Sequence, residues 1–231
     1  MSPGERPRIS IVVPLLDEEP LVADSLDRLR SLDPFEIVAA DGGSRDDTAA
    51  LARARVDRLV VTAPGRAAQL NAAAAVARGD VLLFVHVDTQ LPERALAAVA
   101  ATLADPAVVA GAFRVAIRDP RTRYRVIEWG ANLRAALTGI PYGDQAVFVR
   151  RALFRELGGF PPLPVLEDVA FARRLKRRGQ VRLLRERVAN SPRRWEREGL
   201  LYATVRNWVI TLLFTNGVPA ERLQRWYPKV R

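Results

Sequence analysis

The sequence predicts an α/β fold in which a mostly parallel central sheet is flanked by helices. Apolar, β-branched runs alternate with stretches of helical periodicity from the start of the chain, as expected for strands joined by helical crossovers. The length of 231 residues suits one domain with its own core. No internal repeat and no linker-like stretch interrupts the pattern, so we expect one domain over residues 1–231.

The first half of the chain contains four strand-like runs, each followed by a helical stretch. The fourth run is apolar apart from His86, which predicts a strand buried on both faces of the sheet. The helix before it ends at Gly79, and the helix after it has Pro92 in its first turn, as helix ends prefer. The expected strands are 9–15, 36–40, 58–62 and 81–87, and the expected helices are 20–32, 46–55, 67–78 and 92–103.

The second half is more mixed, because its strand-like runs do not alternate regularly with helices. A long strand-like run opens it, and a helical stretch closed by Gly179 lies near its middle. The expected strands are 108–117, 145–149 and 181–184, and the expected helices are 123–137, 167–178 and 195–214.

Charge and composition exclude some functional classes and leave others open. The formal net charge is +10, nearly all of it from arginine. Two explanations are an arginine-rich genomic composition and attraction to anionic phosphates or lipid head groups. We find no basic, aromatic module typical of nucleic-acid binding. The absence of cysteine excludes disulfides and thiolate metal sites, and residues 1–8 lack a signal-peptide pattern, so we expect a cytoplasmic protein.

Three aspartates fall at the ends of predicted strands. Asp17, Asp41 and Asp88 follow the first, second and fourth strands within a few residues. Parallel sheets of this kind bind ligands beyond the carboxyl ends of their strands, where acids can hold a metal and a polar ligand. Each aspartate alone is equally well explained as a turn former or a helix cap. The three together favour a ligand site.

The second of these aspartates opens the sequence Asp-Gly-Gly-Ser at residues 41–44. Gly43 belongs to a glycine pair that lets the backbone approach a ligand closely. The Asp41 carboxylate can accept hydrogen bonds from a base edge or a ribose hydroxyl. Taken alone, such a turn is a weak indication.

Read in order, these motifs resemble the family 2 glycosyltransferases. The resemblance covers about residues 9–195. It implies a GT-A type, Rossmann-like fold, a nucleotide-sugar donor and inversion at the anomeric carbon. It also divides the chain into a nucleotide-sugar-binding half (9–105), an acceptor half (106–195) and a C-terminal segment of amphipathic helices (196–231). The residues that carry it are 9–14 (ISIVVP), Asp17-Glu18-Glu19, Asp41-Gly42-Gly43-Ser44 with Asp46 and Thr48, Gly65-Arg66 with Asn71, Gly79-Asp80, Asp88, Gly158-Gly159-Phe160 and Glu167-Asp168.

One motif departs from the family pattern. Where the family often has Asp-x-Asp, this chain has His86-Val87-Asp88, which resembles a short bacterial subgroup with His-x-Asp-Thr. The resemblance implies that Asp88 contacts a Mg²⁺ or Mn²⁺ ion. His86 is either a further ligand, which would favour manganese, or a satisfied core histidine.

The resemblance also implies the residues on the donor side. We expect a UDP-sugar as donor, with Arg194 on the diphosphate and Trp195 closing the pocket by stacking. For Arg66 and Arg194, the alternative interpretation is that each is a solvated charge on the surface. The expected donor-side residues are Pro14, Asp17, Glu19, Asp41, Gly43, Arg66, His86, Asp88, Arg194 and Trp195.

On the acceptor side, the family's catalytic base lies in a Glu-Asp pair. This assigns Asp168 as the base that takes the proton of an unidentified acceptor hydroxyl, with Glu167 orienting the acceptor. Asp144 and Gln145 match the stretch that lines the acceptor side. The alternative for Glu167 and Asp168 is the acidic first turn of a helix.

The last predicted helix raises a question about membranes. Its apolar run is too short to span a bilayer. With Arg206, Arg222 and Arg225 nearby, it could lie on the inner surface of the cell membrane. Packing of the same side against the core, or dimerisation through it, are the alternatives. The side is formed by Leu200, Leu201, Val205, Trp208, Val209, Leu212 and Leu213.

Two other functions compete with sugar transfer. Nucleotidyltransferases also use a parallel sheet and acidic metal ligands, but they usually carry a glycine- and basic-rich loop after the first strand, where this chain has residues 15–19 (LLDEE). The second alternative is a non-catalytic nucleotide- or polyanion-binding module. The presence of both Asp88 and Asp168 argues against it.

Overall fold

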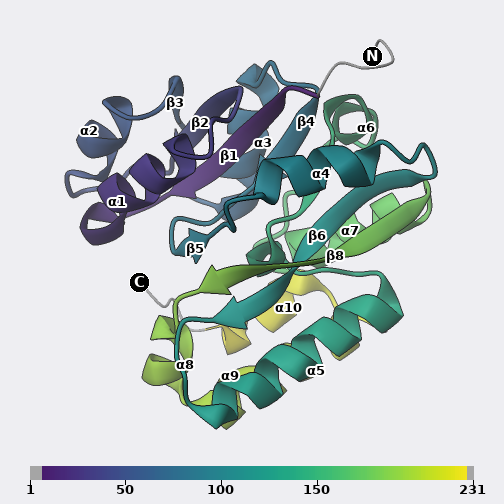
Figure 1. The fold of residues 1–231 in the computed structure, drawn as a ribbon. Coiled ribbons are helices and arrows are strands. Elements are labelled where there is room, and N and C mark those ends of the chain that lie inside the picture. Colours follow the sequence, from purple (N-terminus) through teal and green to yellow (C-terminus); the bar gives the residue numbers. More distant parts are fainter. Residues whose placement is uncertain (1–6, 228–231) are drawn as a thin grey trace.

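The computed structural model describes residues 7–227, with an eight-stranded mixed sheet at its centre (Figure 1). In spatial order the strands are β3 (Arg58–Val61), β2 (Glu36–Asp41), β1 (Ile9–Leu15), β4 (Val81–Phe84), β7 (Phe148–Arg150), β6 (Val108–Ile117), β8 (Gln180–Asn190) and β5 (Thr89–Gln90). The first four are parallel to one another. β7 is antiparallel to β4 and β6, and β8 runs parallel to β6.

Helices cover both faces of this sheet. They are α1 (Glu19–Arg30), α2 (Thr48–Arg53), α3 (Arg66–Val76), α4 (Ala95–Leu103), α5 (Thr122–Thr138), α6 (Arg151–Glu156), α7 (Glu167–Lys176), α8 (Arg193–Glu198), α9 (Leu200–Thr215) and α10 (Ala220–Leu223), with 3₁₀ turns η1 (Gly143–Gln145) and η2 (Gln224–Trp226). The predicted α/β class with flanking helices is therefore confirmed.

Alternation along the central strand β1 explains the two layers of helices. Ile11 and Val13 belong to a core shared with α1 and α4, whereas Val12 belongs to a second core shared with α3 and α7. Successive side chains of a strand point to opposite faces, so an unbroken apolar run builds a core on each side. This is why the parallel half of the sheet was readable from sequence.

The second half of the sheet differs more from the predicted elements. β8 extends from Gln180 to Asn190, far beyond the expected 181–184, and most of its residues before Val188 are at least partly exposed. α6 was not predicted at all. The expected helix at 195–214 is two helices, α8 and α9, separated at Gly199, whose φ of 84° is a left-handed value that glycine adopts readily.

The loop after β4 also differs from the prediction. β4 ends at Phe84 instead of continuing to residue 87, and the backbone then turns, with the Thr89 amide donating to the His86 carbonyl at 3.0 Å. The turn leads into β5, which pairs with the end of β8. His86 and Asp88 therefore lie on a loop at the carboxyl end of the parallel strands.

The expectation that α9 packs its apolar side on the core is corrected by the structure. The side bearing Leu201, Val205, Trp208 and Leu212 is exposed. Within residues 7–227, no helix is both long enough and apolar enough to cross a membrane. The buried residues of α9 are Ala203, Arg206 and Ile210.

A buried charge explains the orientation of α9. Arg206 is 5% exposed and forms an ion pair with Glu198 of α8. Its guanidinium also lies 5.4 Å from the ring centre of Tyr202 and 4.9 Å from that of Tyr227. Paired charges and ring faces make burial of an arginine tolerable, so the narrow face that holds Arg206 turns inward.

Close packing at Gly111 of β6 supplies a test of the fold. A Cβ there would lie 2.7 Å from the Arg182 carbonyl oxygen and would overlap the Phe148 ring. We expect Gly111→Ala to destabilise the protein by about 1–3 kcal/mol, because neither neighbour can move away freely. Urea unfolding measures this change.

Gly130 of α5 is the matched control. A Cβ there would meet only the Trp208 ring, at 3.3 Å, and that side chain is half exposed. Gly130→Ala should leave stability unchanged or raise it through helix propensity by up to about 1 kcal/mol. Equal stability losses in both variants would contradict the packing described for β6.

Candidate functional site

The loops after β1 and β2 are joined by hydrogen bonds into one rim. Asp41, the last residue of β2, is 2% exposed, and its carboxylate accepts from the Gly43 amide at 2.9 Å, the Ser44 amide at 3.0 Å and the Ser44 hydroxyl. The Gly42 amide donates to the Leu15 carbonyl at 2.9 Å. The hydrogen bonds of Asp41 thus hold the conformation of the glycine loop. Gly43, with a φ of 85°, is exposed, so its backbone is accessible to solvent.

The carboxylates of the β1 loop complete this rim. Asp17, at the left-handed φ of 51°, accepts from the Arg45 amide at 2.8 Å. Glu19 accepts from the Asp47 amide at 3.3 Å. Both donor-side candidates therefore hold the two loops together, and the rim they form lies at the carboxyl ends of β1 and β2.

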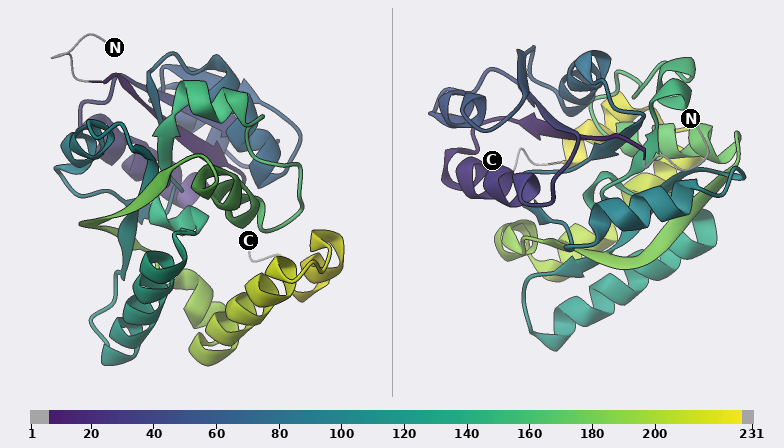
Figure 2. Two further views of the ribbon diagram at one scale, coloured as in Figure 1. Left: turned by 90° about the vertical axis from the view of Figure 1, so that its right-hand side faces the viewer. Right: turned by 45° about the horizontal axis from the view of Figure 1, so that its top comes forward.

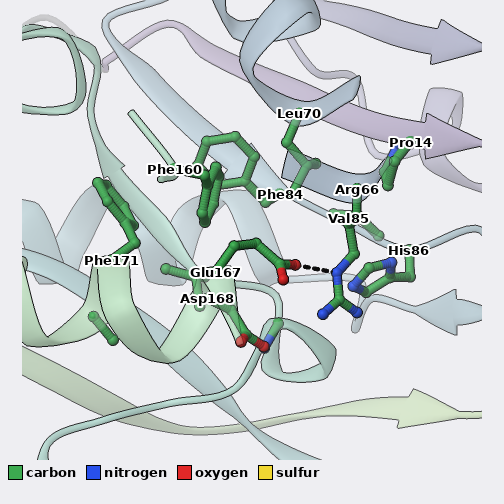
Figure 3. A pocket seen from close by; sticks show the side chains of 13 residues that line it. Pro14, Arg66, Leu70, Phe84, Val85, His86, Phe160, Glu167, Asp168 and Phe171 are labelled. Carbon is green, nitrogen blue, oxygen red and sulfur yellow. Dashed lines mark hydrogen bonds and ion pairs between the residues drawn. The ribbon is translucent and has the colours of Figure 1, made fainter. Parts of the chain in front are cut away.

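A pocket adjoins this rim and collects residues from distant parts of the chain (Figure 3). Residues from β1, α3, the loop after β4, η1 and the start of α7 meet there. The polar and small residues of its lining are Pro14, Arg66, His86, Gly143, Glu167 and Asp168, and its apolar side includes Phe84, Phe160 and Phe171. Five sequence-predicted site residues therefore come together: Pro14, Arg66, His86, Glu167 and Asp168.

The first turn of α7 is held to the loop before β7 by one hydrogen bond. The Asp168 carboxylate accepts from the Gly143 amide at 2.6 Å. A Cβ on Gly143 would lie 3.1 Å from that carboxylate and 3.3 Å from His86 Nε2, so both side chains approach this glycine closely. Leu166, just before the turn, has the left-handed φ of 64°, an unfavourable conformation for leucine. The backbone is thus strained where it presents Glu167 and Asp168.

An ion pair fixes the other side of this turn. The Glu167 carboxylate, 1% exposed as a residue, accepts from Arg66 Nε of α3 (Figure 3). The Arg66 side chain keeps 39% of its surface exposed. Desolvation lowers the pKa of Arg66, but the charges of Glu167 and Asp168 outweigh it and hold the pKa above its ordinary value. Arg66 therefore contributes a permanent positive charge to the pocket.

The Gly-Gly-Phe motif at 158–160 has a structural explanation. Asn71 of α3 donates to the Phe160 carbonyl at 2.8 Å and accepts from the Phe160 amide at 2.9 Å. Gly159 has φ 70°, and a Cβ there would lie 2.5 Å from the Asn71 oxygen. The motif fixes the loop that carries Phe160 into the pocket.

A second charged cluster lies around Asp88. Arg193 of α8 places one guanidinium nitrogen 3.3 Å from the Asp88 carboxylate and another 3.5 Å from that of Glu18. Burial raises the pKa of Glu18; Arg193 opposes this, and the charge of Asp88 adds to the rise. Two carboxylates thus share one cation at the carboxyl end of the sheet.

Sequence reasoning missed both Glu18 and Arg193 as site residues. Glu18 was part of the Asp-Glu-Glu motif that carried the resemblance, and Arg193 is next to the chosen Arg194. Arg194 belongs to the same helix, α8, but its side chain is not among those that the structure describes. The register of α8 places Arg193 against Asp88, and the expected contact of Arg194 with the diphosphate stays a prediction.

The acceptor-side candidates separate into two kinds. Gln145 is 1% exposed, and its side chain bonds the Tyr142 amide, Arg134 and the Phe113 carbonyl. This corrects its expected place at the acceptor, because all its bonding capacity seen here is internal. Asp144 is partly exposed, and its carbonyl accepts from Asn190 at 2.8 Å at the end of β8.

Trp195 lies against α5. It packs edge-on against Tyr124 of α5, with ring centres 6.3 Å apart, and it is absent from the lining of the pocket. Trp195 therefore does not line the pocket around Asp168, and its stacking on the donor stays a prediction. The register of α8 turns Arg193 toward the sheet and Trp195 toward α5.

Comparison with known proteins decides the family. The model of glycosyl transferase family 2 matches residues 10–158. The chain belongs to this family. It is also 30% identical over 168 residues to the PGL/p-HBAD biosynthesis glycosyltransferases of Mycobacterium bovis and Mycobacterium tuberculosis, a match that covers 67% of this chain. The chain spans 63% of the length of those relatives.

Solved structures of family 2-like enzymes share the GT-A fold of this chain. A mannosyltransferase from Pyrobaculum calidifontis, in complex with GDP-Man and Mn²⁺, has a TM-score of 0.69 at 24% identity over 96% of this chain and 69% of its own. Glucosyl-3-phosphoglycerate synthase from Mycobacterium tuberculosis, in complex with Mn²⁺, UDP and glucosyl-3-phosphoglycerate, has a TM-score of 0.65 at 21% identity over 92% and 81%. The predicted family and fold are confirmed, whereas the His-x-Asp-Thr subgroup stays a prediction.

The Arg66–Glu167 pair predicts a pH-dependent effect. Arg66→Ala leaves the Glu167 carboxylate buried without its cation, which should destabilise the protein by about 1–3 kcal/mol near pH 8. At pH 5 the loss should be smaller, because an unpaired buried carboxylate can become neutral by taking up a proton. Urea unfolding at the two pH values measures this difference.

The double variant Arg66→Ala/Glu167→Gln is the control for this effect. Glutamine carries no charge, so the pH dependence introduced by Arg66→Ala should disappear. A stability loss that is the same at both pH values in the single variant would mean that Glu167 is not left as an uncompensated charge.

Proposed function

We propose that this protein transfers a sugar, with inversion, from a nucleoside-diphosphate sugar to an acceptor hydroxyl, using a divalent metal ion. The observation that supports this most is the gathering of Arg66, His86 and Asp168 in one pocket of a family 2 chain, with Asp88 two residues further along the loop after β4. Similar solved enzymes are complexes with GDP-Man or UDP and Mn²⁺. A UDP-sugar is the first donor to test.

We assign the nucleotide to the rim formed by the β1 and β2 loops. The exposed backbone at Gly43 lets a base or ribose approach closely. Asp41 then acts by holding the loop, since its carboxylate is already bonded within it. Arg66, in the adjoining pocket, supplies positive charge toward the donor phosphates.

The residues around Asp88 fit a divalent cation. Asp88 and Glu18 already share a positive charge, that of Arg193, so their carboxylates can face a cation between them. Among the described residues no group of three His, Asp or Glu side chains could hold a metal. Mg²⁺ and related ions are commonly held by one or two carboxylates plus substrate phosphates. A bound ion would stabilise the charge that develops on the diphosphate leaving group.

Arg193 would then have two roles. Without a metal it neutralises Asp88 and Glu18, as the two ion pairs indicate. With a metal and donor present, its guanidinium is free to bind the diphosphate, which suits arginine geometrically. Arg193 is thus a second candidate for the diphosphate contact, beside the one that the sequence motif suggested for Arg194.

Asp168 is our candidate for the catalytic base. It lines the pocket, and its two carboxylate oxygens accept from the Gly143 amide at 2.6 Å and the Val169 amide at 2.7 Å. These bonds fix its orientation, and each oxygen keeps a further lone pair for an acceptor hydroxyl. Glu167 is committed to Arg66, so it positions the turn and is not available as the base. Asp144, the middle residue of η1, stays the acceptor-side candidate.

Calorimetric titration with UDP-, GDP- and dTDP-sugars in the presence of Mn²⁺ tests the proposal directly. We expect one nucleotide class to bind, followed by slow release of free sugar and nucleoside diphosphate when no acceptor is present. Release of pyrophosphate would instead indicate nucleotidyl transfer, and binding of no nucleotide would contradict the proposal.

The metal site predicts opposite effects of two substitutions on Mn²⁺ binding. Asp88→Asn should weaken Mn²⁺ binding to the free protein by roughly tenfold or more, because a carboxylate ligand is lost. Arg193→Ala should strengthen it, because the competing cation is removed. Titration followed by electron paramagnetic resonance measures both.

Nucleotide binding separates the two variants further. In saturating Mn²⁺, Arg193→Ala should still lose affinity for the nucleoside diphosphate, because a phosphate contact is missing. Full transfer activity in EDTA, or unchanged Mn²⁺ affinity in Asp88→Asn, would contradict a metal at Asp88.

The base assignment predicts that Asp168→Asn loses at least ~100-fold in turnover while donor and metal binding are kept. Asparagine keeps an oxygen for the Gly143 amide, so the melting temperature should change little. Asp144→Asn on the neighbouring η1 turn, at the acceptor-side candidate, is the comparison and should raise the acceptor KM more than it lowers turnover. If Asp168→Asn retains more than about a tenth of the wild-type rate, the base lies elsewhere.

A further inference from the structure

Two helices at one end of the molecule share an exposed apolar face, which we call the α5–α9 face. In Figure 1 and in the left view of Figure 2, α5 and α9 both lie at the end of the molecule away from β1–β4, and the left view shows them diverging from each other. Trp208 of α9 reaches Gly130 of α5, so the two helices are neighbours. The face consists of Val126, Trp129, Leu133 and Leu137 of α5, and Leu201, Tyr202, Val205, Trp208, Val209 and Leu212 of α9.

The spacing of these residues makes two stripes. On α9, residues 201, 205, 208 and 212 recur at intervals of three and four, which places them along one side of the helix. On α5, residues 126, 129, 133 and 137 do the same. Their exposure is high, with Leu137 and Leu201 both at 76% and Trp129 at 68%. Large exposed apolar patches on a protein mark interaction sites.

Both helices are attached to the body by few residues. Tyr124, Glu128 and Ala135 are the buried residues of α5, and α9 buries three residues of which one is Arg206. Within these two fully described helices, no acidic side chain is exposed, because Glu128 is 2% exposed. The large apolar side chains of both helices are therefore mostly exposed, and Trp208 also reaches across to α5.

The charges around the face are mostly positive. The exposed charged residues of the adjoining described segments, 120–138 and 195–227, include more arginines than glutamates. The arginines are Arg121, Arg123, Arg125, Arg197, Arg222 and Arg225, and the glutamates are Glu196 and Glu221. Arg121 is paired with Asp119 and Glu196, and Arg125 with Glu128. The other arginines complement an anionic surface.

We propose that the α5–α9 face docks on the surface of an anionic lipid bilayer. Apolar stripes buried at the boundary between head groups and acyl chains, with cations beside them, are the features of helices that lie on membranes. The aromatic residues Trp129, Tyr202 and Trp208 suit this boundary, because their rings are amphipathic. α5, which sequence reasoning did not connect with a membrane, supplies half of the face.

Charge favours a lipid surface over a second copy of this chain. A two-fold dimer places the same patch of each copy against the other. That arrangement would bring the arginines around one face close to those around its partner, where like charges repel. Anionic head groups would neutralise the same arginines.

Vesicle co-sedimentation tests the proposal, without donor or metal, so that it does not depend on the proposed catalysis. The vesicles are phosphatidylcholine alone, or phosphatidylcholine and phosphatidylglycerol at about seven to three. We expect at least ~10-fold stronger partitioning to the anionic vesicles, weakened by added salt, with a blue shift of tryptophan fluorescence on binding.

Two variants and one control locate the binding surface. Leu201→Gln/Leu212→Gln should lose at least ~10-fold in partitioning, because the buried apolar area is reduced. Val61→Gln on β3 removes a side chain that is also 63% exposed but lies outside the face, and it should bind as the wild type does. Arg222→Gln/Arg225→Gln leaves the apolar stripes intact and should reduce the preference for anionic vesicles, which keeps the test informative if the leucine variant does not fold.

Two results would overturn the proposal. One is equal partitioning of wild type and both double variants to anionic vesicles. The other is an absence of vesicle binding together with a dimeric mass by light scattering that Leu201→Gln/Leu212→Gln converts to a monomer, which would assign the face to self-association.

Discussion

The candidate site depends on how the first turn of α7 is held in place. Glu167 is tied to Arg66 of α3, and Asp168 is tied to the amide of Gly143. These two bonds connect three parts of the chain that are far apart in sequence, and they do so next to Leu166, whose backbone is left-handed. Burial of Glu167 makes its pairing obligatory, since an unpaired carboxylate would be strongly destabilising there. The position of the proposed base follows from this structural pair.

Sequence reasoning succeeded where local patterns decide the structure. Continuous apolar strands predicted the parallel half of the sheet, and parallel strands necessarily bring their carboxyl ends to one edge, which located Asp17, Asp41 and Asp88. Sequence reasoning failed where the packing of one element against another decides which side chains meet. The sequence could not indicate that Arg193 pairs with Asp88 and Glu18, because the position of α8 against the sheet decides that contact. Gln145 had a motif match, but its burial depends on Phe113 and Arg134, which are distant in the chain.

The outer elements show the same limit. Most of the first part of β8 is exposed or half-buried, so its sequence lacks the apolar run that marks a buried strand. α9 is apolar on more than one side, and periodicity alone favoured the wider apolar side as the inner one. The Glu198–Arg206 pair reverses this, because a buried arginine must stay with its partner. A single charged residue thus decides which surface the helix shows to its surroundings.

Tyr142 connects this surface to the candidate site. Its hydroxyl and that of Thr211 in α9 are 2.8 Å apart in a hydrogen bond, its ring lies 3.4 Å from the Arg134 guanidinium, and its neighbour Gly143 holds Asp168. Leu166 and Val169, on either side of the Glu-Asp pair, pack with Ile210 and Leu223 of the C-terminal helices. Direct contacts therefore join the pocket to α9. An acceptor bound at the exposed side of α9 would have to extend over a set distance to bring its hydroxyl to Asp168. The length of the acceptor would therefore contribute to selectivity, in addition to its chemical groups.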